Sequence, residues 1–573
     1  MRFYSSCSSA LPKKAGIVHP RLLYADAEGP FLSKFNKNTP ATGTPGRSET
    51  YMSRHHEKRL ARTGQPRIKL HVLGAAGNVT GSLNLFEYHE GDKVTRFILD
   101  IGLHQENENI NRQNRLPAGL TPADIDFVII SHAHIDHSGY LPRFVKDGFK
   151  GFAYTHEATR DILEFLLPDS GYLQEEAARR ANKRAKKFGP GRFQGKQSKG
   201  RSKSHRHPQK AYREQQFMPE VRPLYTEQDA KACMSRIKGL KYDTVYQLAD
   251  GIKVKFTDAC HILGAAVVTL EIGKGARKKT FCFTGNVGRP NTPILRPLAP
   301  VQHADYLLSE STYGNKLHEK RDRLAVLAGI INRAYERARK PHPKFGYGVI
   351  VIPAFAVGRV QGVLYDLRRL MVEKRIPNIP VFLDSPMAIK ATEVHRKYAS
   401  LYNAEAARLV AQGIDPFATP RYMECKDWKQ SALLDQPARE PIIIIGSSGM
   451  AAGGRILQHL QTRLPGKQNT VLFVGYQGTG TLGLKLSNHE ASVVKMFGNI
   501  VHVNATIEFM SDYSGHADYS EIIAWMSKFQ RQPVNTLLVH GEPESLAGFK
   551  GHIEGRLGWK VTIPKTREVF ELV

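Results

Sequence analysis

The chain has 573 residues, 41% of them hydrophobic and 24% charged, which is typical of a globular protein with two or three domains. Lys and Arg number 82 against 53 acidic residues, and the resulting net charge of +29 favours a polyanionic partner, nucleic acid ahead of a membrane surface. The five cysteines form no CxxC pair and no apolar run reaches the roughly 18 residues of a membrane span. These features argue against a disulfide framework and a transmembrane protein, and we expect a cytoplasmic location.

Residues 1–68 form the first distinct segment. They are rich in Ser, Thr, Pro, Gly and basic residues and show no amphipathic periodicity, so we predict a basic, disordered leader. No apolar stretch follows the early charges, which argues against a secretory signal. Two other interpretations of this segment stay open: an organelle transit peptide, or a start codon assigned too far upstream.

Ordered elements begin at residues 67–77, where the alternating strand "RIKLHVLGAAG" runs into a glycine turn. One long helix is expected at 355–376. Further buried strands are expected at 95–102 ("TRFILDIG"), 380–385 ("PVFLDS"), 441–449 ("PIIIIGSSG"), 470–478 ("TVLFVGYQG") and 534–542 ("VNTLLVHGE"). Alternating strands and helices predict an α/β architecture with ligands near the carboxyl ends of the strands.

A basic segment interrupts this pattern at 179–213. It carries fourteen Lys or Arg among 35 residues and no acidic residue. We predict a basic arm that projects from a folded domain and adds sequence-independent affinity for RNA. A solvated loop without a partner is the alternative.

The strongest chemical signal is "SHAHIDHSG" at 131–139, directly after an apolar run. On an extended turn, His132 and His134 point to the same side and can share one ion, while Asp136 and His137 can turn toward a second ion. Imidazole and carboxylate ligands suit Zn²⁺, and open coordination positions would make the site catalytic rather than structural. A pair of ions about 3.5–4 Å apart can clamp the oxygens of a displaced phosphate.

Further ligands must come from distant parts of the chain. His261, in "FTDACHILGAA", and His540, in "NTLLVHGE", each follow a predicted strand. A single histidine at such a place is more often structural than a ligand. Two of them at strand ends, together with the HxHxDH motif, favour a metal site.

The ordered series of motifs resembles the β-CASP branch of the metallo-β-lactamase fold. The HxHxDH turn, Asp100 in "ILDIG", His261 and "FTGNVGR" are similar to the metallo-β-lactamase motifs, and "SESTYG", "SGHAD" and "LVHGE" to the three motifs of the β-CASP branch. That branch includes the pre-mRNA 3′-end cleavage subunit and ribonuclease J. "LGAAGNVTGS", "PAFAVGRVQ", "FLDSPMA" and "GSSGMAAGGR" also resemble the branch, particularly its cleavage-factor-like RNA-processing members. The resemblance runs from about residue 69 to residue 573, apart from the basic segment.

This resemblance implies an αββα sandwich with an inserted α/β β-CASP domain and an active site in the cleft between them. We expect residues 69–313 to form the first part of the metallo-β-lactamase domain, 314–514 the inserted β-CASP domain, and 515–573 the C-terminal part of the first domain.

The resemblance also implies roles for single residues. Two sets of three side chains would each hold one zinc ion: His132, His134 and His261, and Asp136, His137 and His540. Asp100 would orient a ligand histidine from behind. Glu310 and His516 would form a hydrogen-bonded pair in which His516 protonates the leaving 3′ oxygen. The expected catalytic residues are therefore Asp136, Glu310, His516 and Asp100.

Asn286 departs from the family pattern. In "FTGNVGR" it stands where the family usually has an aspartate that bridges the two metal ions. A neutral amide offers one carbonyl oxygen and no charge, so the second metal ion is expected to bind less tightly. Because the other ligands are all present, we favour an active enzyme over a metal-poor pseudo-nuclease and keep Asn286 among the metal-site residues.

A place for RNA phosphates is predicted at 446–455, "GSSGMAAGGR", where a strand ends in glycines and serines before a helix. Backbone N–H groups at a helix start favour a phosphate, so Ser447, Ser448 and Gly449 are candidate substrate-binding residues. A plain tight turn has the same pattern. Arg359, at the start of a predicted helix, could add a charged contact, although a surface arginine is the default, and 475–483 could add a second backbone contact.

Together these features predict a zinc-dependent ribonuclease with two Zn²⁺ ions that hydrolyses phosphodiester bonds of single-stranded RNA, as an endonuclease, a 5′-exonuclease or both. The alternative is a catalytically weak or inactive RNA-binding protein of the same fold, and Asn286 is the feature in its favour. A DNA-directed nuclease is less favoured, because the repair members of the branch tend to carry another residue in place of His540. No membrane partner is expected, and a homodimer stays open.

Overall fold

The computed structural model describes residues 67–104, 114–117, 119–188, 220–478 and 480–573, without the side chains of 184 and 186–188. The predicted leader (1–68), apart from its last two residues, lies outside the described residues. The basic segment (179–213) does so from residue 189 onward.

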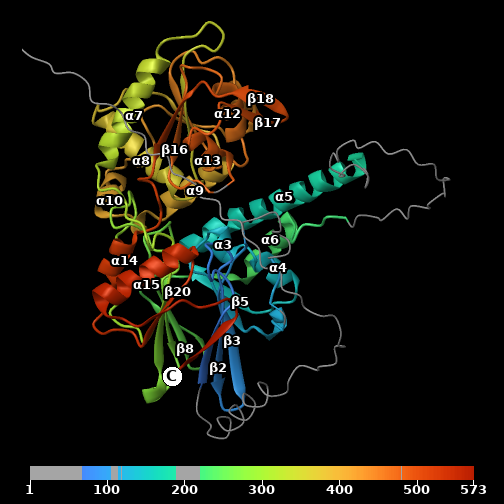
Figure 1. Cartoon of the computed structure of the whole chain (residues 1–573), viewed down its shortest axis with the longest axis vertical. Helices are drawn as coiled ribbons and strands as arrows, with labels where there is room; N and C mark the ends of the chain where they lie inside the picture. Colours follow the sequence, from blue (N-terminus) through green and yellow to red (C-terminus); the bar gives the residue numbers. More distant parts are fainter. Residues whose placement is uncertain (1–66, 105–113, 118, 189–219, 479) are drawn as a thin grey trace, which may run out of the picture. The chain divides into compact units, whose positions relative to one another are not determined.

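Two seven-stranded sheets pack against each other as a sandwich (Figure 1). The first sheet has the order β22-β1-β2-β3-β4-β5-β6 and the second the order β21-β20-β11-β10-β9-β8-β7. The strands of the first are β1 (Arg67–Val72), β2 (Leu83–Glu90), β3 (Lys93–Ile101), β4 (Phe127–Ile129), β5 (Phe152–His156), β6 (Ile237–Leu240) and β22 (Glu568–Leu572). Those of the second are β7 (Val245–Ala249), β8 (Ile252–Asp258), β9 (Ala266–Ile272), β10 (Lys279–Phe283), β11 (Tyr306–Ser309), β20 (Asn535–Leu538) and β21 (Val561–Thr562).

Alternating apolar side chains fill the space between the two sheets. Every second residue of β1 is buried, as expected for a strand with one face in a core. Phe86 stacks on Phe97, and Phe97 on Phe127, with ring centroids 4.9 and 4.8 Å apart. Phe281 of the second sheet meets Phe86 edge-on at 4.9 Å. These aromatic contacts join the two inner faces.

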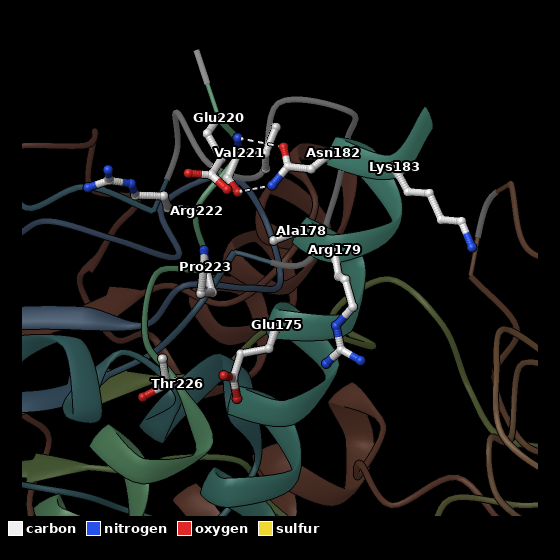
Figure 2. Close-up of a pocket in the computed structure, with 10 residues that line it drawn as sticks. All are labelled: Glu175, Ala178, Arg179, Asn182, Lys183, Glu220, Val221, Arg222, Pro223 and Thr226. Atoms are coloured by element: carbon white, nitrogen blue, oxygen red, sulfur yellow. Dashed lines mark hydrogen bonds between the residues drawn. The ribbon is translucent and has the colours of Figure 1, made fainter. Parts of the chain in front are cut away.

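Helices cover the outer faces of the sandwich. They are α3 (Ile135–Ser138), α4 (Leu141–Lys146), α5 (Glu157–Phe188), α6 (Glu227–Cys233), α14 (Tyr519–Met526) and α15 (Pro543–Leu557), with the 3₁₀ turns η1 (Pro122–Asp124), η2 (Met234–Arg236) and η3 (Gly275–Arg277). Phe144, Ile162 and Phe549 bury their side chains from these helices against the sheets. The segment 220–226 runs along the second half of α5 (Figure 2).

A third, six-stranded sheet follows in the chain. Its order is β14-β13-β15-β12-β16-β19, and its neighbouring strands are parallel. The strands are β12 (Val349–Pro353), β13 (Val381–Leu383), β14 (Tyr422–Glu424), β15 (Ile442–Gly446), β16 (Thr470–Val474) and β19 (Thr506–Met510). Val349 and Val351 of β12 enter one core and Ile350 and Ile352 the other, so both faces of this sheet are covered.

The covering elements are mostly helices: α7 (Arg323–Ala338), α8 (Arg359–Val372), α9 (Pro386–Lys397), η4 (Ala399–Leu401), α10 (Ala404–Ala411), α11 (Trp428–Leu433), α12 (Ile456–Arg463) and α13 (Leu482–Ser487). The antiparallel strands β17 (Val493–Met496) and β18 (Asn499–His502) form a separate hairpin. None of the helices in the described part of the chain combines the length and apolar character that crossing a membrane requires.

The third sheet is inserted between two neighbouring strands of the sandwich. The chain leaves the second sheet after β11 and returns at β20, which pairs with β11 in parallel. It ends in β22, which pairs with β1. The predicted αββα sandwich with an inserted α/β part is confirmed, whereas the predicted limits at residues 69, 314 and 515 stay predictions.

Candidate metal centre and active site

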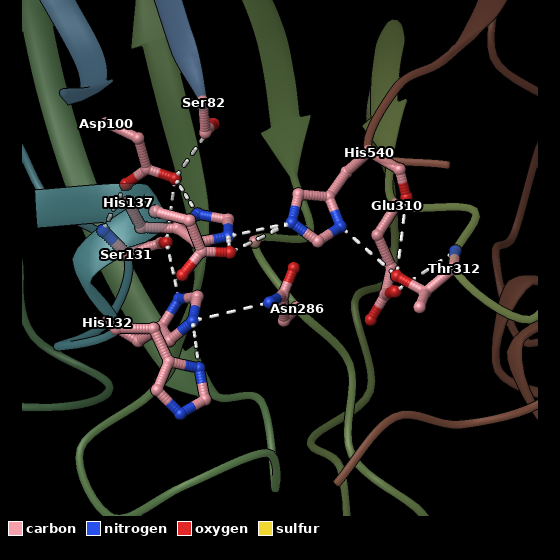
Figure 3. A network of polar contacts seen from close by, with 12 residues as sticks. Ser82, Asp100, Ser131, His132, His137, Asn286, Glu310, Thr312 and His540 are labelled. Atoms are coloured by element: carbon pink, nitrogen blue, oxygen red, sulfur yellow. Dashed lines mark hydrogen bonds and ion pairs between the residues drawn. The ribbon is translucent and has the colours of Figure 1, made fainter. Parts of the chain in front are cut away.

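The residues singled out in the sequence follow the carboxyl ends of strands in both sheets of the sandwich. Asp100 lies at the end of β3, and His132 follows β4. His261 follows β8, Asn286 follows β10, and His540 follows β20. Because the ends of these strands meet along one edge, side chains from across the sequence reach one place (Figure 3).

The HxHxDH segment changes conformation within the motif. His134, with φ −57° and ψ 143°, is the N-cap of α3, which begins at residue 135, so Asp136 and His137 lie on a short helix. The motif is therefore not an extended turn throughout, because its second half is helical. Gly102 permits this close packing: a Cβ there would fall 1.6 Å from the carbonyl oxygen of Asp136.

Nitrogen and oxygen atoms converge in two clusters of three side chains. In the first, Nδ1 of His134 lies 3.1 Å from Nε2 of His132 and 3.2 Å from Nε2 of His261. The second cluster consists of Asp136, His137 and His540. Its two imidazole Nε2 atoms are 3.1 Å apart, and the carboxylate Oδ2 lies 3.4 and 3.5 Å from them. Within each cluster the ligand atoms all lie within 4.8 Å of one another.

The Nδ1 atoms of His132, His137 and His540, which face away from the clusters, each contact a hydrogen-bonding side chain. Asp100, fully buried, accepts from Nδ1 of His137 at 2.6 Å and from the backbone N–H and hydroxyl of Ser131 at 2.7 and 3.0 Å. The Ser131 hydroxyl lies 3.0 Å from Nδ1 of His132, and Thr312 Oγ1 lies 3.1 Å from Nδ1 of His540. Such contacts fix ring orientation and tautomer in metal sites.

His261 is held in the same way, by the carbonyl oxygen of Gly515 at 2.9 Å from its Nδ1. Ser131, Thr312 and Gly515 were not among the site residues predicted from the sequence. All three stand inside quoted motifs, but which ring nitrogen Ser131 and Thr312 contact depends on how the histidine rings are turned. Gly515 acts through its backbone, for which residue identity gives no signal.

Two residues of the centre have left-handed backbone. Asp100 and His540 have φ of 57° and 53°. This conformation costs a non-glycine residue about 1–3 kcal/mol. The backbone around them therefore has to hold both side chains in these orientations.

Burial keeps the first cluster uncharged. It lowers the pKa of His134 to about 4 and holds those of His132 and His261 well below the ordinary histidine value. At Asp136 burial alone would raise the pKa, but the charge of His137 and a hydrogen bond from His540 outweigh it and leave the pKa below its ordinary value. The first cluster thus presents free imidazole lone pairs, and the second presents a carboxylate beside two imidazoles, which are side chains of the types that zinc takes as ligands.

Asn286 lies between the two clusters and is 2% exposed (Figure 3). Its Nδ2 is 3.4 Å from Nε2 of His132, and its Oδ1 is buried without a hydrogen-bond partner among the described residues. The two ends of an amide are interchangeable by rotation. A buried carbonyl oxygen without a donor, beside converging imidazoles, fits a site that takes a cation.

Glu310 and His516 form a pair beside the clusters. Nδ1 of His516 lies 2.9 and 3.1 Å from the two carboxylate oxygens of Glu310, which is 1% exposed and also accepts from the backbone N–H of Val287 at 2.5 Å. Burial alone would raise the pKa of Glu310, but His516 lowers it below its ordinary value. Nε2 of His318, a residue not predicted from the sequence, donates to the carbonyl oxygen of His516 at 2.9 Å.

The predicted phosphate loop is fixed by side chains of the inserted part. Ser447 Oγ lies 2.5 Å from Ser385 Oγ, and Ser448 Oγ accepts from the backbone N–H of Ala452 at 3.3 Å. The carbonyl oxygen of Gly449 accepts from Gln477 at 3.1 Å. The loop leaves β15 at its carboxyl end, but α12 begins only at residue 456, so Ser447, Ser448 and Gly449 do not lie at its N-terminus as expected.

Arg359 is more enclosed than the surface position expected by default. It begins α8, its guanidinium lies 4.4 Å from the ring centroid of Phe355, and its Nη1 is buried without a hydrogen-bond partner among the described residues. Burial lowers the pKa of Arg359 to about 10, and its charge contributes to the low pKa of His134. Gly475 makes room for it, since a Cβ there would fall 2.7 Å from its Cζ.

Three family models match successive parts of the chain. The metallo-beta-lactamase superfamily matches residues 97–198, the Beta-Casp domain residues 360–486, and the Zn-dependent metallo-hydrolase RNA specificity domain residues 500–564. They confirm the resemblance drawn from the sequence motifs.

Similar proteins include Ribonuclease TTHA0252 of Thermus thermophilus, which is 28% identical over 502 residues, covering 87% of this chain and 99% of its own. Transcription termination factor FttA of Methanocaldococcus jannaschii is 25% identical over 525 residues, covering 88% of this chain and 73% of its own. A solved protein of unknown function from Enterococcus faecalis V583 aligns with 88% of this chain and 100% of its own at 12% identity and a TM-score of 0.45.

Proposed function

The chain belongs to the β-CASP group of the metallo-β-lactamase superfamily, a group of metal-dependent hydrolases, and on that premise we propose that it is a zinc-dependent ribonuclease acting on single-stranded RNA. The observation that carries the proposal is the placement of two three-residue clusters of metal-ligand type beside the Glu310–His516 pair.

Two zinc ions are the proposed cofactors. The side chains that would hold them are His132, His134 and His261 for one ion and Asp136, His137 and His540 for the other, with Asn286 between them. When bound, such ions act as Lewis acids toward the phosphate and lower the pKa of water. Asp100 keeps His137 in the tautomer whose Nε2 faces the site.

The proposed proton donor is His516. Hydrolysis forms a bond from a water oxygen to phosphorus and breaks the bond from phosphorus to the 3′ oxygen, which then needs a proton. Nδ1 of His516 is engaged by Glu310, so Nε2 is the nitrogen that can deliver it. Glu310 orients the ring and balances the charge of its protonated form.

The proposed substrate contacts lie on the inserted part. Ser447, Ser448 and Gly449 would receive the scissile or an adjacent phosphate. Arg359 supports this placement because it is half-buried, its buried Nη1 has no hydrogen-bond partner in the part of the chain that the structure describes, and it acts electrostatically on His134. A guanidinium held this way lacks only an anion, and phosphate is the anion that RNA brings.

A second candidate function is RNA binding with little or no catalysis. Asn286 favours it, because a neutral amide between the clusters leaves two cations less well compensated than a carboxylate would. Metal content separates the two: close to two zinc ions per chain would count against the inactive form.

The test is incubation of the purified protein with single-stranded RNA labelled at either end and added Zn²⁺ or Mn²⁺, beside His134→Ala. Cleavage that disappears in the variant would establish a metal-dependent ribonuclease, and the two labels would separate internal cuts from 5′ trimming. Tight binding without cleavage by both proteins would sink the enzymatic proposal. Asn286→Asp would then be tried for restoring activity.

A further inference from the structure

Helix α5 is long enough to reach well beyond the sandwich that it covers. Its 32 residues span about 48 Å at 1.5 Å per residue. Ala158, Ile162, Leu163 and Leu167, in its first half, are fully buried. Its second half has one face against the segment 220–227 and one face in solvent.

Side chains on the inner face of this second half form hydrogen bonds with the segment 220–227. The side-chain amide of Asn182 donates to the carbonyl oxygen of Val221 and accepts from its N–H, both at 2.9 Å (Figure 2). Glu175 accepts from the backbone N–H of Glu227 at 3.0 Å, and Gln174 binds the same segment through a further backbone N–H. These hydrogen bonds fix the second half of α5 against the segment 220–227.

The outer face carries exposed cations and a ring. Tyr172, Arg179, Arg180 and Lys183 share this face, because helix residues spaced by 7, 8 and 11 positions project from one side. Tyr172 is 47% exposed, and the side chains of Arg179 and Arg180 are 68% and 76% exposed. Glu176, on the same face, is 21% exposed and pairs with Arg179 at 2.6 Å and Arg180 at 3.7 Å.

The cavity next to α5 has a different character. It has a volume of about 610 Å³ and lies between α5 and the segment 220–226. Glu175 and Glu220 line it together with Arg179, Lys183 and Arg222. Arg179 and Lys183 belong to both the cavity lining and the outer face. Two carboxylates accompany the cations in the cavity, whereas Glu176 is the carboxylate that pairs with those of the outer face, so the outer face is the better surface for a polyanion.

We propose that the outer face of α5, formed by Tyr172, Arg179, Arg180 and Lys183, binds single-stranded RNA outside the catalytic cleft. The three cations contact phosphates, and the tyrosine ring gives a base a surface for stacking. The sequence that continues from this face contains no acidic residue before Glu214, so nothing in it repels the strand. The identity of the ligand as RNA rests on the proposed function.

The position of α5 relates this face to the metal clusters. The helix begins directly after β5, the neighbour of the strand that leads into the HxHxDH motif. Asp161 on α5 accepts from Lys397 Nζ at 2.5 Å and Tyr398 OH at 2.8 Å, at the end of α9 in the inserted part. The direction of the helix is thus fixed against both parts of the protein.

This placement sets a length requirement for the RNA. From Glu157 to Arg180 the helix covers about 35 Å, or roughly ten nucleotides of a stacked strand at about 3.4 Å each. RNAs long enough to span from the cleft to the outer face gain affinity from it, and shorter RNAs do not.

The test compares a triple variant, Arg179→Gln with Arg180→Gln and Lys183→Gln, with a control in which the exposed Lys528, Lys560 and Lys565 are changed to Gln. Every full-length protein also carries His134→Ala, so that binding is measured without cleavage. Fluorescence anisotropy gives the affinity for single-stranded RNAs of about 8 and about 30 nucleotides between about 50 and 200 mM salt.

For the long RNA, the slope of log K against log salt should become shallower by about 2 in the triple variant, from about 0.7 per lost phosphate contact. The short RNA and the control variant should keep their wild-type slopes. An unchanged slope for the long RNA, or an equal loss for the short one, would overturn the proposal, and the first result would leave an acidic protein as the partner to examine.

Tyr172→Ala separates stacking from charge. It should weaken binding of the long RNA while the slope of log K against log salt stays unchanged. An unchanged affinity would show that Tyr172 does not contact the RNA. Because these measurements need no cleavage, they stay separate from the proposed function. If the protein with His134 intact cleaves RNA but the triple variant shows no change of slope, the surface is overturned. If the slope changes but the protein with His134 intact does not cleave RNA, the ribonuclease is overturned and the surface stands.

Discussion

Replacing His459 by glutamine should destabilise the inserted part most strongly in mildly acidic solution. Asp384, fully buried after β13, accepts from His459 Nε2 at 2.6 Å, Ser431 Oγ at 2.6 Å and Arg455 Nη1 at 2.7 Å. Nδ1 of His459 lies 2.9 Å from a carboxylate oxygen of Asp435. His459 is therefore a buried cation between two carboxylates.

The pH dependence follows from the directions of the pKa shifts. Burial alone would lower the pKa of His459, but its bonds to Asp384 and Asp435 raise it above the ordinary value of 6.5. Its stabilising contribution is complete below about pH 6.5 and is lost as the pH rises through the folded-state value. The pKa of Asp384 is lowered by its three donors against the effect of burial, so its contribution is lost only as the pH falls below about 4.

The expected magnitude is that of breaking a buried ion pair, about 3–5 kcal/mol. For a unit of about 150–250 residues, 1 kcal/mol lowers Tm by about 2–4 °C, so His459→Gln should lower it by about 10 °C near pH 6. The difference from wild type should shrink toward pH 9. Thermal unfolding of the full-length proteins at both pH values, followed by circular dichroism, measures it.

A second buried histidine provides the control. His395 bonds to the carbonyl oxygen of Ala391 at 2.7 Å, and burial lowers its pKa to about 4. Its contribution is present above about pH 6.5 and lost as the pH falls, so the deficit of His395→Gln should grow toward high pH. Equal pH trends for the two variants would refute the assigned charge of His459.

Three further predictions concern the metal centre. Gly102→Ala should displace α3 through the carbonyl oxygen of Asp136, and elemental analysis after dialysis should find less than half of the wild-type zinc. Asn286→Asp should tighten the weaker metal ion, seen as a second saturating step at lower free zinc in a metal titration; an unchanged titration would remove Asn286 from the site. Glu310→Gln should lower kcat by about 10²–10⁴-fold with little change in KM, because His516 loses the carboxylate that balances the charge of its protonated form. A rise in KM alone, in steady-state cleavage assays, would contradict this role.

The metal-ligand candidates could be found from the sequence because each follows a recognisable strand. The HxHxDH motif, His261 and His540 are brought together by a general property of sheets, whose strand ends share an edge. Ser131 and Thr312 could not be given roles in advance, because their contacts with the outer nitrogens depend on how the histidine rings are turned.

The surroundings of Arg359 and Asp384 could not be predicted from strand and helix patterns, because they depend on contacts between distant parts of the sequence. Arg359 starts a helix as expected, but its enclosure depends on Gly475, which belongs to a different strand-to-loop segment. Asp384 and His459 meet because β13 and β15 are neighbours in the third sheet and α12 follows β15. The order of strands in space, which periodicity does not reveal, decides both contacts.

The insertion of the third sheet between β11 and β20 also orders events during synthesis. A nascent chain that has been made only through β19 already contains the HxHxDH motif, His261 and Asn286, but it lacks His516 and His540. Strand β1 likewise keeps an open edge until β22 emerges to pair with it. The Glu310–His516 pair and the cluster of Asp136, His137 and His540 are thus completed after the rest of the fold. On the proposed function, a nascent chain would therefore have no assembled centre with which to cleave RNA.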